Sequence, residues 1–228
     1  MTRFQEIVTS FISGVMTALV VIAVSVAHCA EPANVAVVRG EDYTTGSGFV
    51  IAVGPKTSII ATNYHVCVGN YRSIVFNLAH PKYLKIKVTL ANGDEKMGDV
   101  VETSRYSDLC LVRIEGTYRP LPLSRGLRLA PGEPLEIAPP QPFKYHSLRY
   151  IGPDKSADQW AESHLGSEYA AGSCIEGMSG SAILNRKGKV VGVLWGCSNK
   201  IGFTYFVPFS KLKRLLEKLD SKYKVLYN

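Results

Sequence analysis

The segment Gly177-Met178-Ser179-Gly180-Ser181, followed directly by the apolar run Ala182-Ile183-Leu184, carries the strongest local signal in this chain of 228 residues. A serine between glycines is common in ordinary turns. It also suits a nucleophile, because bulkier neighbours would block the backbone N–H groups that must converge on a developing oxyanion. On this second interpretation Gly177 and Ser179 supply those N–H groups, and the chain must also hold a base for the serine.

A candidate base and a candidate carboxylate lie upstream. His65 stands at the end of an apolar strand, in Ala61-Thr62-Asn63-Tyr64-His65-Val66-Cys67, and Asp108 opens the run Asp108-Leu109-Cys110-Leu111-Val112. Taken singly, each has an ordinary interpretation, since a lone histidine is usually a surface or core residue and an aspartate before a strand usually belongs to a turn. The other histidines have no comparable context: His28, His80, His146 and His164.

Around these segments the sequence is a series of short apolar and β-branched runs, punctuated by Gly, Pro or Asn. Many short strands at close spacing are typical of an all-β barrel or sandwich. Asn92-Gly93 predicts a hairpin because both residues tolerate positive φ. The proline-rich stretch 118–142 suits a connection between two β halves. The predicted strands lie at residues 35–38, 48–51, 57–61, 74–76, 85–90, 100–101, 109–114, 135–137, 147–151, 182–184, 190–195 and 203–207.

Only the end of the chain has a helical pattern. Ser210 is a candidate cap, and an apolar face follows it at positions i, i+3, i+4 and i+7. The opposite face is basic, so the helix could bind a membrane surface, but packing of its leucines on the second β half is the favoured interpretation. The apolar face consists of Leu212, Leu215, Leu216 and Leu219.

Composition excludes several classes of function. Apolar residues make up 46% of the chain and charged residues 20%, which is typical of a globular protein. The net charge is +7, but the basic residues are scattered except near the C-terminus, so no nucleic-acid partner is expected. No C-x-x-C or H-x-x-x-H spacing occurs, so no metal site is expected.

The N-terminus carries an uncharged stretch from Ile7 to Ala27, preceded by Arg3 and followed by small residues. This pattern predicts a secretory signal peptide over residues 1–30. An uncleaved signal anchor is the alternative, because 21 uncharged residues just span a bilayer of about 30 Å hydrocarbon thickness. Either interpretation places the rest of the chain outside the cytosol, secreted, periplasmic or membrane-anchored, where disulfides persist.

Five segments, in this order, resemble the trypsin-like (chymotrypsin-fold) serine proteases, and most closely the bacterial high-temperature-requirement (HtrA) type. The order His65, Asp108, Ser179 also separates the chain from α/β-hydrolases, in which the serine comes first. The similar segments are Gly46-Ser47-Gly48-Phe49-Val50-Ile51, Thr62-Asn63-Tyr64-His65-Val66, Asp108-Leu109-Cys110-Leu111-Val112, Gly177-Met178-Ser179-Gly180-Ser181 and Gly202-Phe203-Thr204-Tyr205-Phe206-Val207-Pro208.

The resemblance implies an all-β fold of two antiparallel six-stranded β-barrels with a C-terminal helix. The protease domain would span residues 31–220, with barrel 1 at about 33–118, barrel 2 at about 119–208 and the helix at about 210–220. Residues 221–228 would form a tail, and no PDZ domain is expected after it. No cofactor is implied.

The same resemblance assigns roles to the site residues. Ser179 would attack the scissile carbonyl, His65 would take its proton and pass it to the leaving amine, and Asp108 would orient the imidazole and stabilise its cation. The oxyanion hole would be formed by the N–H groups of Gly177 and Ser179. Met178 stands where trypsin has the aspartate that receives a new N-terminus, so activation by that route is not expected.

Four positions are expected to form the substrate pocket: Ser173, Cys174, Trp195 and Gly196. Trypsin has an aspartate at the position of Ser173, so cleavage after Lys or Arg is disfavoured. Leu194 replaces the histidine that glutamyl-specific relatives use, so cleavage after Glu is disfavoured too. By elimination the pocket is expected to accept a neutral P1 side chain, the one that precedes the scissile bond.

Four cysteines outside the N-terminal segment allow three disulfide pairings or four buried free thiols. The resemblance favours Cys67–Cys110, beside the triad, and Cys174–Cys197, on the two walls of the substrate pocket.

Together these observations predict a serine endopeptidase that hydrolyses protein or peptide substrates. A catalytically silent substrate-binding pseudoprotease on the same fold is the alternative, and an esterase with the same nucleophile is a third possibility. Contact with a membrane is expected only through an uncleaved N-terminal anchor.

Overall fold

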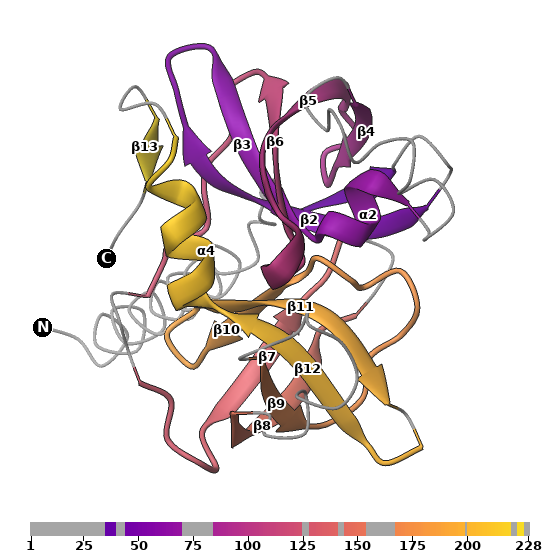
Figure 1. Ribbon diagram of the computed structural model, residues 1–228, viewed down its shortest axis with the longest axis vertical. Helices are drawn as coiled ribbons and strands as arrows, with labels where there is room; N and C mark the ends of the chain where they lie inside the picture. The colour runs from indigo at the N-terminus through magenta and orange to yellow at the C-terminus, as the bar shows by residue number, and fades with distance from the viewer. Residues whose placement is uncertain are drawn as a thin grey trace, which may run out of the picture. The chain divides into compact units, whose positions relative to one another are not determined.

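The computed structural model describes residues 35–39, 44–69, 84–124, 128–140, 144–153, 167–198, 200–219 and 223–225 (Figure 1). The predicted signal peptide or anchor and the predicted strand at 74–76 lie outside these residues. Within the described ranges, no helix combines the length and the apolar character needed to cross a bilayer.

The first half of the chain forms a closed antiparallel barrel, barrel 1. Its strands follow the ring order β1-β4-β5-β6-β3-β2, and β1 pairs back onto β2 to close it. Side chains alternate along these strands as the barrel requires: in β4, Ile86, Val88 and Leu90 are buried, whereas Lys85 and Lys87 are not. The strands are β1 (Val35–Arg39), β2 (Thr45–Val53), β3 (Thr57–Thr62), β4 (Lys85–Leu90), β5 (Glu95–Ser104) and β6 (Leu109–Glu115).

The predicted hairpin at Asn92-Gly93 is confirmed. It joins β4 to β5, with Thr89 opposite Glu95 in the register. Gly93 has φ +86°, which glycine adopts at no steric cost, and the Asn92 side chain accepts a hydrogen bond from the Asp94 amide at 3.1 Å.

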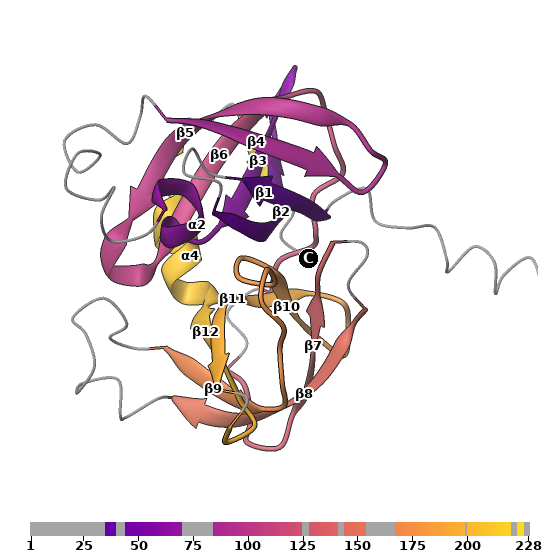
Figure 2. The same ribbon diagram turned by 90° about the vertical axis from the view of Figure 1, so that its right-hand side faces the viewer.

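The second half forms another closed barrel, barrel 2, in the ring order β10-β11-β12-β9-β8-β7. Figure 2 shows the two barrels one above the other, with the connecting chain running between them. The predicted fold class, two six-stranded antiparallel barrels with a C-terminal helix, is therefore confirmed. The strands are β7 (Pro134–Ala138), β8 (His146–Pro153), β9 (Glu168–Ala171), β10 (Ala182–Asn185), β11 (Val190–Ser198) and β12 (Phe203–Pro208).

The C-terminal helix α4 (Phe209–Leu216) begins one residue and ends four residues earlier than predicted, so Leu219 lies beyond it. Its N-cap is Pro208, extended at φ −66° and ψ 149°, and Ser210 lies exposed in the first turn, so the predicted Ser210 cap is wrong. A proline fits this place because its missing N–H would find no partner at a helix start. Leu212, Leu215 and Leu216 are buried, which confirms that the helix packs on the protein.

The tail contributes a strand that the sequence did not indicate. β13 (Lys224–Val225) pairs antiparallel with β2, so Lys224 lies opposite Val53 and Val225 opposite Ala52. The Tyr223 ring covers Gly54, where an added Cβ would lie 3.1 Å from it. The described part of the chain thus leaves barrel 2 through α4 and reaches barrel 1 at β13.

Candidate active site

His65 is presented by a short helix rather than by a strand. β3 ends at Thr62, Asn63 is extended, and helix α2 (Tyr64–Val68) follows at once. A helix of five residues is not stable by itself, so tertiary contacts must hold it. Every residue of α2 except His65 is buried, so the helix exposes only the imidazole.

Asp108 has an unusual backbone. It follows the 3₁₀ turn η2 (Arg105–Ser107) with φ 47° and ψ 47°, and it is the one non-glycine residue with positive φ in the described ranges. Aspartate tolerates this left-handed conformation better than most residues. The side chain is 7% exposed.

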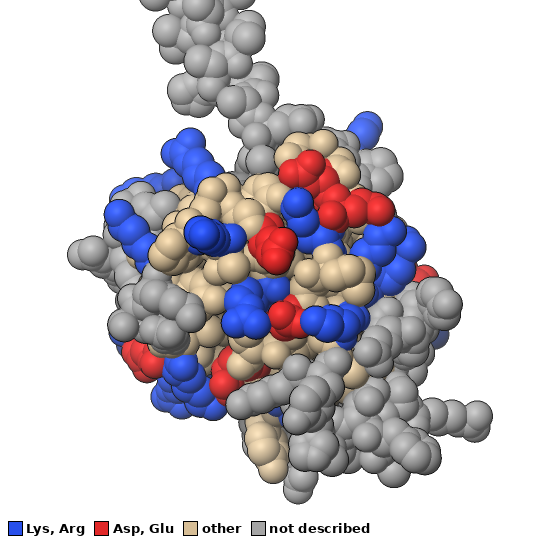
Figure 3. All heavy atoms as spheres, turned by 90° about the horizontal axis from the view of Figure 1, so that it is seen from above, with Lys and Arg blue, Asp and Glu red and all other residues tan. Residues whose placement is uncertain are grey.

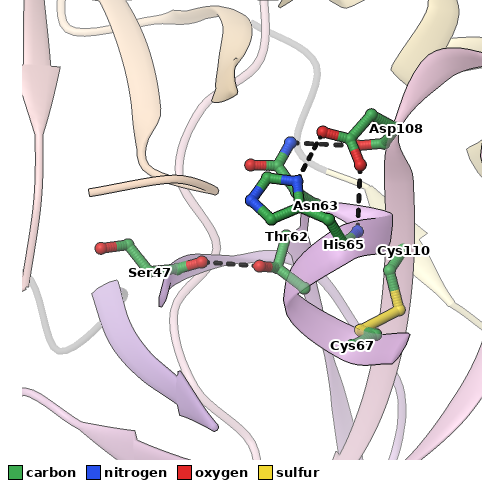
Figure 4. Close-up of a disulfide and its surroundings, with 7 residues drawn as sticks. All are labelled: Ser47, Thr62, Asn63, His65, Cys67, Asp108 and Cys110. Carbon is green, nitrogen blue, oxygen red and sulfur yellow. Dashed lines mark hydrogen bonds and ion pairs between the residues drawn. A yellow bond between two sulfur atoms is a disulfide. The ribbon is translucent and has the colours of Figure 1, made fainter. Parts of the chain in front are cut away.

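Asp108 and the segment around His65 are joined by three hydrogen bonds (Figure 4). The His65 ring Nδ1 lies 2.8 Å from Asp108 Oδ2, and the His65 backbone N–H donates to Oδ1 at 3.0 Å. The Asn63 amide Nδ2 donates to the Asp108 carbonyl oxygen at 3.0 Å. Both carboxylate oxygens and the backbone of Asp108 are therefore engaged by α2 and the residue before it.

This geometry assigns the imidazole tautomer. A carboxylate only accepts hydrogen bonds, so Nδ1 carries the proton and Nε2 is left as an acceptor. Nε2 points away from Asp108 in Figure 4, and the His65 side chain is 42% exposed. The imidazole thus presents an acceptor nitrogen on the side away from Asp108, on a side chain that solvent reaches.

Ser179 lies at the start of the connection to β10, partly exposed. Its Oγ donates to the Trp195 carbonyl oxygen at 3.2 Å, and the described contacts contain no hydrogen bond from Ser179 to His65. The structure therefore brings His65 and Asp108 into direct contact. The hydroxyl of Ser179, the third member of the predicted triad, is instead bonded to β11.

The backbone around Ser179 contains two amides without acceptors. Met178 donates to the Ile175 carbonyl oxygen at 3.1 Å, and Gly180 donates to the Leu194 carbonyl oxygen at 2.7 Å. The N–H groups of Gly177 and Ser179, the predicted oxyanion donors, have no acceptor among the described residues. Amides left without partners at one point of a loop are what an oxyanion hole requires.

One further residue of barrel 1, Ser47, bonds to this loop, and Thr62 in turn bonds to Ser47. Ser47 donates to the carbonyl oxygens of Gly177 and Ser179, and its own carbonyl accepts the Thr62 hydroxyl at 2.7 Å. Ser47 belongs to one of the segments that resemble the proteases, Gly46-Ser47-Gly48, but the sequence alone indicates no role for it. Only the meeting of the two barrels shows what it touches.

Both disulfides are present in the structure. Cys67 on α2 is bonded to Cys110 on β6, with a Cα–Cα distance of 6.6 Å, and both residues are buried. Cys174 is bonded to Cys197 on β11, with a Cα–Cα distance of 5.9 Å. The first bridge therefore joins the segments that carry His65 and Asp108.

The residues predicted to form the substrate pocket lie beside the second bridge. Cys174 adjoins Ser173, and Cys197 adjoins Gly196, so the bridge links the two expected walls. Trp195 continues into a row of aromatic rings, with ring centroids 5.4 Å apart for Trp195 and Tyr205, and 6.5 Å apart for Tyr205 and Tyr169. None of the four predicted pocket residues carries a charge.

A separate cavity of about 1150 Å³ lies between α4 and barrel 2, and the catalytic candidates do not line it. Tyr150 and Glu168 do. Burial raises the pKa of Tyr150 to about 12, with the nearby Glu168 carboxylate adding to the effect. Burial also raises the pKa of Glu168. Both pKa shifts belong to residues that line this cavity, and neither residue is part of the candidate active site.

Charged side chains are mixed on the face of barrel 1 shown in Figure 3, where Lys and Arg alternate with Asp and Glu. Asp99 pairs with Lys85 and with Arg113, and these partners hold the pKa of its carboxyl below the ordinary value. Lys87 pairs with Glu95 at 2.8 Å. The described residues of this face form no continuous basic stripe.

Comparisons with known proteins give the family and the fold to which the chain is similar. Residues 46–193 match the family described as "Trypsin-like peptidase domain". Proteins named "Serine protease HtrA-like" from Staphylococcus aureus strains MRSA252 and USA300 are 24% identical over 199 residues, which is 80% of this chain and 24% of theirs. The chain thus spans about a quarter of the length of these curated relatives.

Two solved structures have the same fold. The Rv3671c protease in its inactive form has a TM-score of 0.61 and 16% identity, and the similarity covers 82% of this chain and 89% of that one. The serine endoprotease from Yersinia pestis has a TM-score of 0.59 and 20% identity, with 81% and 62% covered.

Proposed function

The chain belongs to the family of trypsin-like peptidase domains, and from that premise we propose that it is a serine endopeptidase with Ser179 as nucleophile, His65 as base and Asp108 as the orienting carboxylate. The observation that carries this proposal is the His65–Asp108 pair, with Nδ1 held at 2.8 Å and Nε2 open to solvent. A buried aspartate that holds both the ring and the backbone of a histidine suits a general base.

In the proposed mechanism, the Ser179 side chain rotates from the Trp195 carbonyl toward Nε2 of His65 when a substrate enters. Hydrogen bonds of a catalytic site are often long or misaligned before the substrate binds, so the contact at 3.2 Å does not oppose this step. The oxygen then attacks the scissile carbonyl while His65 takes the proton, and Asp108 stabilises the imidazolium. His65 next protonates the leaving amine, and the same cycle with water releases the acyl group.

The developing oxyanion would be bound by the N–H groups of Gly177 and Ser179. Loss of a single oxyanion donor typically costs about 10²–10³-fold in kcat. We further propose a neutral P1 side chain, because the pocket positions Ser173 and Trp195 place no carboxylate or cation there.

The second candidate is a pseudoprotease that binds substrates without cleaving them. The specific observation in its favour is the Ser179 hydroxyl, which is bound to the Trp195 carbonyl rather than to His65. An extracytoplasmic location is proposed for either candidate, because the two disulfides persist in an oxidising compartment.

The deciding experiment is labelling of the purified chain with a fluorophosphonate probe, which reacts only with an activated serine. Ser179→Ala, His65→Ala and Asp108→Asn are the controls, each checked by circular dichroism for an intact fold. Labelling of the parent and of none of the controls supports the proposed triad, and a peptide library then defines P1. Folded parent protein that is not labelled would refute the triad and favour the pseudoprotease.

A further inference from the structure

Ser47, in β2 of barrel 1, holds the loop of barrel 2 that carries the candidate nucleophile. Its backbone N–H donates to the Ser179 carbonyl oxygen at 2.7 Å, and its Oγ donates to the Gly177 carbonyl oxygen at 2.8 Å. Two bonds from a single residue thus reach the two loop residues whose N–H groups face the proposed oxyanion. We propose that Ser47 is a positioning residue that fixes the oxyanion-binding conformation of residues 177–180, an inference that rests on the proposed function.

The planarity of the peptide bond explains why these two contacts matter. In a trans peptide unit the C=O and the N–H point in opposite directions, so fixing one fixes the other. The unit from Gly177 to Met178 is held by Ser47 at its oxygen and by the Ile175 carbonyl at its N–H, at 3.1 Å. It cannot rotate without breaking both bonds.

The unit from Ser179 to Gly180 is held in the same way, by Ser47 at its oxygen and by the Leu194 carbonyl at its N–H, at 2.7 Å. The unit between these two, from Met178 to Ser179, accepts the Ser181 N–H at 2.9 Å. Its own N–H, that of Ser179, is therefore directed to the opposite side. Ser47 supplies two of the anchors that keep this donor in place.

Ser47 is itself held firmly. It is fully buried, it pairs with Val37 of β1, and its carbonyl oxygen accepts the hydroxyl of Thr62 at 2.7 Å. Thr62 is the last residue of β3, three residues before His65. The same serine therefore connects the strand that leads to the base with the loop that carries the nucleophile.

The backbone of the loop is only weakly restricted by its own residues. Gly177 and Gly180 have φ of +90° and +93°, and glycine restricts the backbone least of all residues. Met178, between them, is buried in the core of barrel 2, which anchors one side chain but does not orient the neighbouring carbonyls. The hydroxyl of Ser47 orients the carbonyl of Gly177.

The test compares Ser47→Ala with Ser58→Ala as a matched control. Ser58 is also fully buried in barrel 1, and its Oγ donates to the carbonyl oxygen of Gly116 at 2.9 Å, away from the site. Each variant removes one buried hydroxyl bonded to a glycine carbonyl. Peptide hydrolysis, thermal unfolding and inhibition by a peptide aldehyde with a neutral P1 residue are measured for both.

The aldehyde reports on the oxyanion hole. The serine hydroxyl adds across its C=O, and the former carbonyl oxygen occupies the place of the oxyanion. For Ser47→Ala we expect kcat to fall by about 10- to 100-fold with KM within about twofold, and the aldehyde Ki to rise by a similar factor. Ser58→Ala should keep kcat and Ki within about twofold of the parent.

Three results would overturn the inference: equal kcat in the two variants, a lower kcat for Ser47→Ala with an unchanged aldehyde Ki, or failure of both Ser47→Ala and Ser47→Gly to fold, which would show a purely structural residue. Parent and Ser58→Ala proteins that hydrolyse nothing would refute the proposed function itself, and this inference with it.

Discussion

Gly180, directly after Ser179, has no room for a side chain. A Cβ placed there would lie 2.0 Å from the Ser47 carbonyl oxygen and 2.5 Å from Thr62 Oγ1, and the backbone φ is +93°. The first neighbour is backbone and cannot turn aside. The approach of β2 to the nucleophile loop, on which the contacts of Ser47 depend, therefore requires glycine at this position.

We expect Gly180→Ala to destabilise the protein far more than Gly93→Ala. Gly93 has a similar φ of +86°, but a Cβ added there would have nothing within 4 Å. Its substitution therefore costs only the backbone strain of a side chain at positive φ, about 1–2 kcal/mol. Gly180→Ala adds a steric clash, for a total loss above about 4 kcal/mol. Urea unfolding of both variants measures the difference, and equal losses would contradict the packing described.

At the residue scale, sequence order and resemblance predict His65, Asp108 and Ser179 as the catalytic candidates. The structure places the first two in contact. The direction of the Ser179 hydroxyl is not a property of the motif, because it depends on a carbonyl of β11. The contact of Ser47 with Gly177 joins residues 130 positions apart, and no local pattern records it.

Among the elements, α2 depends most on its covalent connection. It is five residues long and carries the proposed base, and the Cys67–Cys110 bridge ties it to β6 two residues after Asp108. The Cys174–Cys197 bridge joins segments of the expected pocket and touches neither His65 nor Asp108. The two bridges should therefore affect different kinetic constants.

Replacing Cys67 and Cys110 by alanine should lower kcat more than it raises KM, whereas replacing Cys174 and Cys197 should mainly raise KM. Loop lengths of 43 and 23 residues predict stability losses of about 4 and 3 kcal/mol in the chain-entropy account. Kinetics and denaturant unfolding of both double variants provide the check. A KM effect from the first pair with kcat unchanged would argue against its role in holding the base.

Elements with a clear apolar alternation or face were predicted from sequence, such as β4 and α4. Those that were missed are short: α2, β9 and β13. Their residues take their conformation from what they pair with or pack on, so propensity alone does not mark them. The start of α4 was misplaced for a related reason, since β12 continues to Pro208 and leaves no room for a serine cap.

Glu168, on β9, gives a prediction about pH. Burial raises the pKa of its carboxyl, so the folded state favours the protonated acid more than the unfolded state does. Its contribution to stability is therefore present at pH below the ordinary value of 4.5 and is lost as the pH rises through the folded-state value. Glu168→Gln should have a higher Tm than the parent at pH 8 and nearly the same Tm at pH 4. The same Tm difference at both pH values would count against it.

At the scale of the molecule, one apolar cluster spans both barrels and the C-terminal helix. It contains Phe49 and Ile59 of barrel 1, Val193 and Val207 of barrel 2, and Leu212 of α4. A site built from both barrels needs this shared core, because His65 and Ser179 come from different barrels. If the barrels unfolded separately, His65 and Ser179 would not keep their positions relative to each other.

We therefore expect a single cooperative unfolding transition, and Leu212→Ala to weaken both barrels together. Leu212 is fully buried in the shared cluster, and its truncation should cost about 2–5 kcal/mol. Trp195 lies on β11, so its fluorescence, measured in a Trp160→Phe background, follows barrel 2. Hydrogen exchange of amides in β3 and β6 follows barrel 1.

The control is Lys213→Ala, because Lys213 follows Leu212 on the helix but is exposed. This substitution should change the free energy of unfolding by less than about 0.5 kcal/mol. In Leu212→Ala we expect the same loss in free energy of unfolding from two probes, the tryptophan fluorescence and the hydrogen exchange of β3 and β6. The reason is that a shared core transmits the loss from one barrel to the other. If fluorescence moves while β3 and β6 keep their protection, the barrels unfold independently. Local contacts such as those of Ser47 would then have to keep His65 and Ser179 in place relative to each other.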